Sequence, residues 1–165
     1  MDPVGRLIVV RHAEAGWGSG ADRDRSLTER GLQQASLLGR TLTVAGWQPG
    51  AVVHSEARRT TQTWQRMAAG LQEPALVASS WSLYSDGPVA YLQAVALHGG
   101  TQGTAMVVGH NPVVGELVEL LTGARLPFGT AHAALLQARL DGPWQGWEIT
   151  LGTPLRFEVE RVLTG

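Results

Sequence analysis

Polar side chains suited to binding an anion follow three separate apolar runs of the chain. Arg11 and His12 come after the first run, Arg59 lies shortly after the second, and His110 and Asn111 come after the third. A guanidinium group binds phosphate oxygens through two parallel hydrogen bonds, and an imidazole nitrogen can attack phosphorus as a nucleophile. These residue types favour phosphate binding, with His12 as a candidate nucleophile.

Other nucleophiles and other phosphate ligands are missing from the sequence. There is no cysteine, and all 13 basic residues are arginine. Thiol nucleophiles and thiolate metal sites are therefore excluded, and a phosphate has to be held by arginine, histidine or backbone N–H groups. No serine lies in a nucleophile elbow. Charge repulsion from Arg11 and Arg59 would lower the pKa of His12 and favour the neutral imidazole that an attack requires.

The elements that must position these residues alternate between strands and amphipathic helices. Apolar runs predict strands over residues 7–10, 51–53, 75–77, 105–108, 133–140 and 147–151. The continuous Val and Ile runs are typical of strands covered on both faces. We therefore expect a three-layer α/β/α fold with a mostly parallel central sheet. The carboxyl ends of parallel strands meet at one edge, so the three polar segments should converge there.

Capping residues mark where the helices begin. Thr28 predicts the start of a first helix, and Ser55 is a candidate cap for a second. A third helix is expected over residues 89–97, and Asn111 with Pro112 predicts the start of a fourth. Two helix N-termini should therefore adjoin the phosphate-binding residues, and their free N–H groups favour an anion.

Length and charge limit the class of protein. The chain has 165 residues, 44% of them hydrophobic, and a net charge of -1, which suits one domain over residues 1–165. No overall basic charge is available to hold nucleic acid. We find no secretory signal and no apolar stretch of about 20 residues, so a cytoplasmic protein with no membrane partner is expected. The sequence does not indicate the oligomeric state.

The motifs around these residues resemble those of the histidine phosphatase superfamily, also called the phosphoglycerate mutase-like family. They occur in the family's order, and each lies at a predicted strand or helix boundary. The matching segments are Arg11-His12-Ala13 for Arg-His-Gly, Leu27-Thr28-x-x-Gly31, Ser55-x-x-x-Arg59-x-x-x-Thr63, and Gly109-His110-Asn111-Pro112. Ala13 replaces the family's glycine, and its methyl group can narrow the site or alter the backbone there.

The spacing of the motifs indicates a subgroup. Many relatives insert a helical lid between the second and third polar segments, but the stretch between Arg59 and Gly109 leaves little room for one. The chain therefore resembles the small SixA-type phosphohistidine phosphatases. Residues 83–92 and 128–141 also look similar to that subgroup.

The resemblance implies a reaction in which His12 takes a phosphoryl group onto Nε2 and water then releases it, with no metal and no organic cofactor. The implied partner is a phosphorylated protein carrying phosphohistidine, or a small phosphate ester. Residues implied to bind the phosphoryl group are Arg11, Arg59, His110 and Asn111, of which Asn111 is equally a candidate helix cap. Asp86 is the first candidate for a proton donor and Glu14 the second. Absence of a strong acid would favour cleavage of N–P over O–P bonds.

Three other functions are compatible with the same residues. A phosphatase for small phosphate esters would act on sugar phosphates or phosphoserine and not on phosphohistidine. A non-catalytic phosphate- or phosphoprotein-binding module would bind phosphate without turnover. A metalloenzyme using His12 and His110 would need a carboxylate cluster that the sequence does not supply convincingly.

Overall fold

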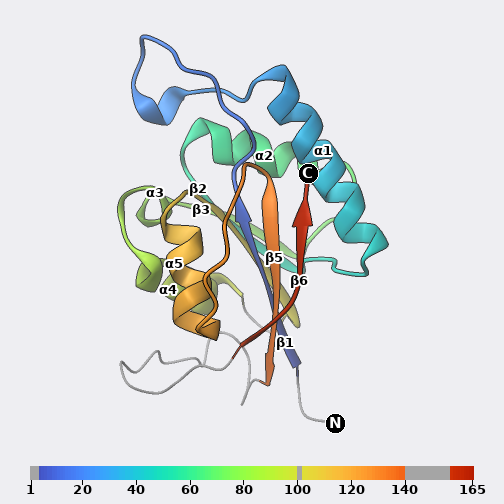
Figure 1. Cartoon of the computed structure of the whole chain (residues 1–165). Coiled ribbons are helices and arrows are strands. Elements are labelled where there is room, and N and C mark those ends of the chain that lie inside the picture. Colours follow the sequence, from blue (N-terminus) through green and yellow to red (C-terminus); the bar gives the residue numbers. More distant parts are fainter. Residues whose placement is uncertain (1–3, 100–101, 140–156) are drawn as a thin grey trace.

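A six-stranded sheet forms the centre of the structure, a computed structural model that describes residues 4–99, 102–139 and 157–165 (Figure 1). Its strands are β1 (Val4–Arg11), β2 (Ala51–Ser55), β3 (Leu76–Ser80), β4 (Thr104–Gly109), β5 (His132–Arg139) and β6 (Glu158–Thr164). They are ordered β3-β2-β4-β1-β5-β6. The pairs β3–β2, β2–β4 and β4–β1 are parallel, whereas β5 is antiparallel to both β1 and β6. The mostly parallel sheet is confirmed; β6 was not expected, and the strand expected at 147–151 lies outside the described residues.

Helices cover both faces of this sheet. They are α1 (Glu29–Val44), α2 (Arg58–Ala68), α3 (Ser82–Ser85), α4 (Pro88–His98) and α5 (Val113–Thr122), with a 3-10 turn η1 (Asp22–Asp24) in the loop before α1. Figure 1 shows α1 and α2 on one side of the sheet and α4 and α5 on the other. The expected three-layer α/β/α arrangement is confirmed. Between α2 and β4 the described chain holds β3, α3 and α4, and no large lid.

Alternation of side chains along β1 explains why both faces are covered. Ile8 and Val10 pack in one cluster with apolar residues of α1 and α2, while Leu7 and Val9 pack in a second cluster with residues of α4 and α5. All four side chains are fully buried. Burial of each stabilises the fold by about 1.5–3 kcal/mol, so the central strand and its carboxyl end are firmly placed.

The first expected helix cap is confirmed, and the other two are wrong. The Thr28 hydroxyl accepts a hydrogen bond from the Gly31 N–H. Ser55 belongs instead to β2, and α2 begins three residues later with Ala57 at its N-cap. Asn111 also caps nothing, because α5 begins after Pro112 and the Asn111 amide bonds elsewhere. Both side chains bond instead to residues far away in the chain.

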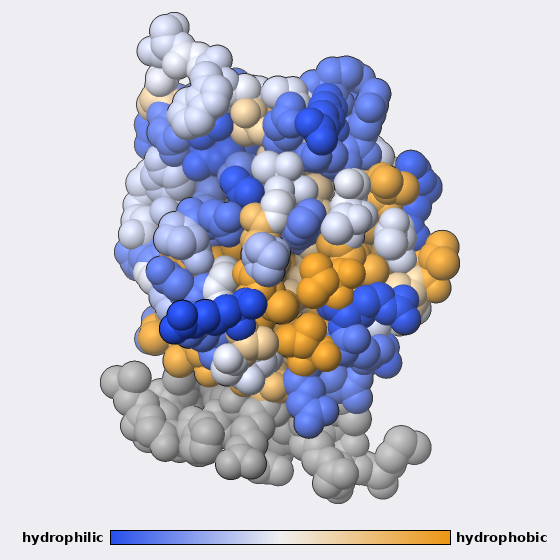
Figure 2. All heavy atoms as spheres, viewed as in Figure 1, coloured by the Kyte–Doolittle hydropathy of each residue, from blue (hydrophilic) through white to orange (hydrophobic). Residues whose placement is uncertain are grey.

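Hydropathy differs between the two ends of the molecule. Figure 2 shows hydrophilic residues gathered at the upper end, over the loop before α1 and the start of that helix, and apolar residues lower down, over β6 and its neighbours. The upper end is the one to which the carboxyl end of β1 points (Figure 1). None of the helices described is long and apolar enough to cross a membrane.

A close approach of α1 to the segment after β1 requires glycine at position 31. A Cβ atom on Gly31 would collide with the backbone carbonyl of Glu14. The same carbonyl accepts a hydrogen bond of 2.9 Å from the Thr28 N–H. Glycine at position 31 therefore lets the first turn of α1 pack directly on the backbone two residues after His12.

We expect Gly31→Ala to lower the free energy of unfolding by about 1–3 kcal/mol, because the added methyl group forces α1 away from this segment. Gly18→Ala is the matched control, since nothing lies within 4 Å of a Cβ there. The control should change stability by no more than about 0.5 kcal/mol. Urea denaturation of the two variants measures both values; equal midpoints would show that the close approach does not constrain the fold.

Candidate active site

Two imidazoles lie side by side where β1 and β4 end. The strands are paired in parallel with Arg11 opposite Gly109, and the next residue along each is a histidine, His12 and His110. Their ring centroids are 5.3 Å apart, and each residue is 8% exposed. The convergence predicted from the sequence therefore occurs at adjacent strands of the sheet.

A single hydrogen bond sets the proton position on His12. Its Nδ1 lies 2.7 Å from the carbonyl oxygen of Ala13. A carbonyl can only accept, so Nδ1 carries the proton and Nε2 is left with a free lone pair. Arg59 Nε donates to that Nε2 at 3.3 Å. The nitrogen with the nucleophilic lone pair therefore directly faces a cationic group that can bind phosphate.

His12 is neutral at physiological pH. Burial, which is the largest effect, and the charges of Arg59, Arg11 and Arg25 together lower the pKa of His12 to about 4, against the opposing effect of the Ala13 hydrogen bond. The sequence predicted the arginine contribution; the larger effect, burial, required the structure. A neutral imidazole can attack without first losing a proton.

His110 is held at two points and still has an unused ring nitrogen. Its backbone N–H donates to the Tyr91 hydroxyl at 3.1 Å, and its Nε2 lies 2.8 Å from Ser55 Oγ. The Ser55 hydroxyl already accepts from the Ala57 N–H, so it can donate its own proton to His110 Nε2. Burial, followed by the charge of Arg59, lowers the pKa of His110 to about 3. Nδ1 then carries the proton of the neutral ring, and it is buried without a hydrogen-bond partner in the part of the chain described.

Arg59 connects the nucleophile to the loop before α1. It lies in the first turn of α2 and is 6% exposed. Its Nη1 donates to the backbone carbonyl of Asp22 at 2.8 Å, and its Nη2 pairs with the Asp22 carboxylate at 3.1 Å. A buried guanidinium is costly unless it is paired, and these contacts provide the pairing.

The backbone after His12 is tied to α2 by a threonine of the Ser-x-x-x-Arg-x-x-x-Thr motif. The Ala13 N–H donates to Thr63 Oγ1 at 3.0 Å, and that hydroxyl donates to the Arg59 carbonyl at 2.6 Å. The Ala13 methyl group is fully buried in the apolar cluster beneath α1 and α2. It therefore packs in the core and does not narrow the site, contrary to the expectation from the sequence.

Arg11 and Asn111 meet at one backbone carbonyl. Arg11 Nη1 and Asn111 Nδ2 each donate to the oxygen of Phe128 at 3.0 Å. Arg11 Nε is buried with no partner among the described residues, and burial lowers the pKa of this arginine. Arg11 thus has donor capacity left for an anion, while Asn111 holds the Phe128 segment against the end of β1.

The two candidate proton donors are bonded to residues other than the imidazoles. Glu14 accepts from the Thr28 hydroxyl at 2.9 Å and pairs with Arg30 at 3.3 Å, at the start of α1. Asp86 follows α3, where its carboxylate accepts from the Ser85 hydroxyl at 2.8 Å. In the described structure neither carboxylate bonds to the site histidines or to Arg59.

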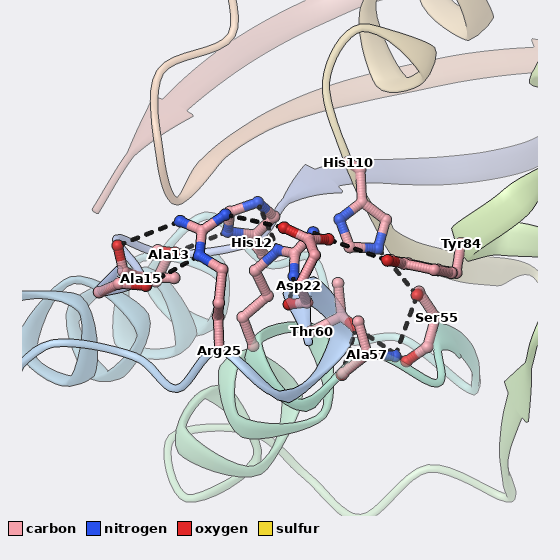
Figure 3. A network of polar contacts seen from close by, with 12 residues as sticks. His12, Ala13, Ala15, Asp22, Arg25, Ser55, Ala57, Thr60, Tyr84 and His110 are labelled. Carbon is pink, nitrogen blue, oxygen red and sulfur yellow. Dashed lines mark hydrogen bonds and ion pairs between the residues drawn. The ribbon is translucent and has the colours of Figure 1, made fainter. Parts of the chain in front are cut away.

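Asp22 is the carboxylate that the structure brings to this site and that sequence reasoning missed. Besides Arg59, its partners are the Tyr84 hydroxyl at 2.9 Å and Arg25 at 3.2 Å (Figure 3). Burial raises its pKa, but the hydrogen bonds from Tyr84 and Arg25 and the charge of Arg59 outweigh this and hold the pKa at about 2. The only local signal was the Asp22–Arg25 spacing, which is too common to mark a site.

The arrangement can hold an anion and transfer a phosphoryl group. Arg11, Arg59 and the His110 Nδ1–H offer donors around the unprotonated Nε2 of His12, in a setting that is largely closed to water. Preorganised donors of this kind stabilise charge that develops in a transition state. Within the described residues, no group of three or more His, Asp or Glu side chains could hold a metal ion.

Comparison with known proteins agrees with the phosphoryl-transfer chemistry that the site supports. Residues 7–81 match the model of the histidine phosphatase superfamily, branch 1. The chain is 34% identical to an uncharacterized chloroplastic protein of Arabidopsis thaliana, over 87% of this chain and 75% of that protein. It is also 34% identical to an uncharacterized protein of Mycobacterium tuberculosis, over 92% of this chain and the full length of that protein.

Solved structures with the same fold include proteins named as SixA phosphohistidine phosphatases. One from Nakamurella multipartitia superposes with a TM-score of 0.78 at 27% identity, covering 97% of this chain and 95% of that one. One from Agrobacterium tumefaciens gives a TM-score of 0.78 at 23% identity, covering 96% and 97%. With its motifs placed at the ends of β1 and β4 and in α2, and with these relatives along most of its length, the chain belongs to the histidine phosphatase superfamily.

Proposed function

We propose that this protein is a cytoplasmic phosphatase that hydrolyses phosphohistidine in a protein substrate, through a phosphohistidine intermediate on its own His12. The observation that carries the proposal is the hydrogen bond from His12 Nδ1 to the Ala13 carbonyl, which leaves Nε2 unprotonated beside Arg59. The structural likeness to proteins named as SixA phosphohistidine phosphatases supports this choice of substrate.

In the first half of the reaction, the Nε2 lone pair of His12 forms a bond to phosphorus. The P–N bond of the substrate breaks, and its electron pair stays on the departing imidazole nitrogen. Arg59, Arg11 and His110 donate hydrogen bonds to the phosphoryl oxygens as the charge on them redistributes. His12 Nδ1 keeps its proton throughout, hydrogen-bonded to the Ala13 carbonyl, so the phosphorylated ring carries a proton on its other nitrogen.

In the second half, water forms a new P–O bond and the P–Nε2 bond breaks. His12 leaves as a neutral imidazole, because Nδ1 has kept its proton, and the water gives one proton to the solvent. The same three donors bind the oxygens again. His12 neither gains nor loses a proton between the two halves of the reaction. This suits an imidazole that burial keeps neutral.

Among the described residues, the one carboxylate bonded to Arg59 is not a proton donor, and this supports an N–P substrate. The carboxylate that contacts Arg59 is Asp22, whose pKa of about 2 leaves it ionised. An alkoxide leaving group needs a proton from the enzyme, whereas a protonated phosphohistidine releases a neutral imidazole without one. Hydrolysis of small phosphate esters is the alternative function. Assays on both kinds of substrate distinguish it from phosphohistidine hydrolysis.

We expect His12→Ala to lose turnover both on a phosphohistidine-bearing protein and on p-nitrophenyl phosphate, with a chelator present, because the nucleophile is gone. His98→Ala, at the far end of α4, is the matched control and should keep wild-type rates. Release of inorganic phosphate measures both. A His12→Ala protein that still turns over would rule out the covalent route, and a wild type active on sugar phosphates or phosphoserine but inert on phosphohistidine would rule out the substrate.

We expect Arg59→Ala to reduce kcat/KM by the equivalent of about 3–4 kcal/mol, by analogy with the loss of one oxyanion donor. Arg58 provides a matched control, since it is the adjacent residue of the same helix turn and its side chain is exposed. Arg58→Ala should retain wild-type kcat/KM. Steady-state kinetics on p-nitrophenyl phosphate would contradict the assignment if the two variants lost activity equally.

A further inference from the structure

Asp22 lies on the solvent side of the site, and its role is not accounted for by the steps above. Its side chain is 51% exposed, whereas the two imidazoles are 8% exposed. Figure 3 shows its carboxylate between His12 on one side and Tyr84 on the other. A ligand that enters the site and reaches His12 therefore meets this carboxylate.

The carboxylate has room for another hydrogen-bond donor. Oδ2 accepts from both Arg59 and Tyr84, whereas Oδ1 accepts only from Arg25 among the described residues. A carboxylate oxygen accepts two hydrogen bonds. Because the side chain is half exposed, the remaining position on Oδ1 is open to a ligand.

One guanidinium separates this carboxylate from the attacking nitrogen. Arg59 places Nε at 3.3 Å from His12 Nε2 and Nη2 at 3.1 Å from Asp22 Oδ2. A phosphoryl group at His12 competes with Asp22 for this guanidinium, and a second negative charge beside it is unfavourable. Tyr84 and Arg25 remain as partners that keep the carboxylate near the site when Arg59 turns to the phosphoryl group.

The negative charge of Asp22 determines which leaving group it can stabilise. A carboxylate with a pKa of about 2 has no proton to give at neutral pH, so it cannot serve an alkoxide or phenoxide. It can accept a hydrogen bond from a cation, and such charge-assisted bonds are the strong ones. A phosphohistidine ring protonated on its second nitrogen presents a cationic N–H on the side away from phosphorus.

We propose that Asp22 is a specificity residue whose carboxylate accepts a hydrogen bond from the protonated second ring nitrogen of the substrate phosphohistidine and thereby favours N–P over O–P bonds. The inference rests on the proposed function. His12 Nε2 bonds to phosphorus, the P–N bond breaks, and its electron pair stays on the substrate nitrogen. The other ring nitrogen already holds its proton, so neutral imidazole leaves and Asp22 transfers no proton.

The test is the ratio of kcat/KM on a phosphohistidine-bearing protein to kcat/KM on p-nitrophenyl phosphate. Asp22→Asn should lower this ratio about tenfold or more, because the amide is neutral while the size of the side chain is kept. Asp22→Glu keeps the charge and should retain more of the ratio than Asp22→Asn. Asp24→Asn, two residues away in the same exposed turn, should leave the ratio unchanged.

Each other outcome has a definite meaning. An unchanged ratio in Asp22→Asn, with both activities reduced alike, would overturn the proposal in favour of a residue that only positions Arg59. Faster turnover of both substrates would overturn it in favour of a carboxylate that obstructs the site. A greater loss on p-nitrophenyl phosphate than on phosphohistidine would overturn it, because the carboxylate would then favour the O–P bond. A wild type without activity on phosphohistidine would instead overturn the proposed function, and this inference with it.

Discussion

The hydrogen bond between His12 Nδ1 and the Ala13 carbonyl determines what this site can do. It assigns the single proton of a neutral imidazole to one nitrogen and leaves the lone pair on the other, facing Arg59. The bond is local, between neighbouring residues, but the rest of the fold keeps it in place. Thr63 holds the Ala13 backbone, and the packing of Gly31 on Glu14 holds the chain that follows.

Burial serves the chemistry in two ways and creates one cost. It keeps both imidazoles neutral, with pKa values of about 4 for His12 and about 3 for His110, and it strengthens every hydrogen bond that an arginine donates to an anion. The cost is a guanidinium of Arg59 that is only 6% exposed. Asp22 offsets this cost by pairing with Arg59, so the exposed loop before α1 contributes a charge to the site.

Patterns that are local in the sequence predicted much of this arrangement. The apolar runs that become β1, β2 and β4 are continuous, and each ends next to a polar residue, so the sheet and the convergence of His12 and His110 follow from adjacency of parallel strands. Thr28 was identifiable as a cap because its partner lies three residues away. Motif spacing placed Arg59 in the second helix, and the structure has it in the first turn of α2.

Contacts between segments that are distant in the chain could not be predicted from local sequence patterns. Asp22 and Tyr84 are separated in the chain by α1, β2, α2 and β3, and only the folded sheet brings them together. Ser55 and Asn111 resemble helix caps in sequence, but tertiary partners, His110 and the Phe128 carbonyl, take their side chains instead. Glu14 and Asp86 were candidates from the family resemblance alone, and the structure pairs both with neighbours at helix ends.

The most direct measurement is the identity of the phosphorylated atom. Wild-type protein mixed with a phosphoryl donor, stopped in base and digested, can be analysed for the residue and the ring nitrogen that carry the phosphate. The account predicts a base-stable, acid-labile phosphate on Nε2 of His12. Phosphate on Nδ1, on another residue such as Ser55 or Asp22, or on none at all during turnover would contradict it.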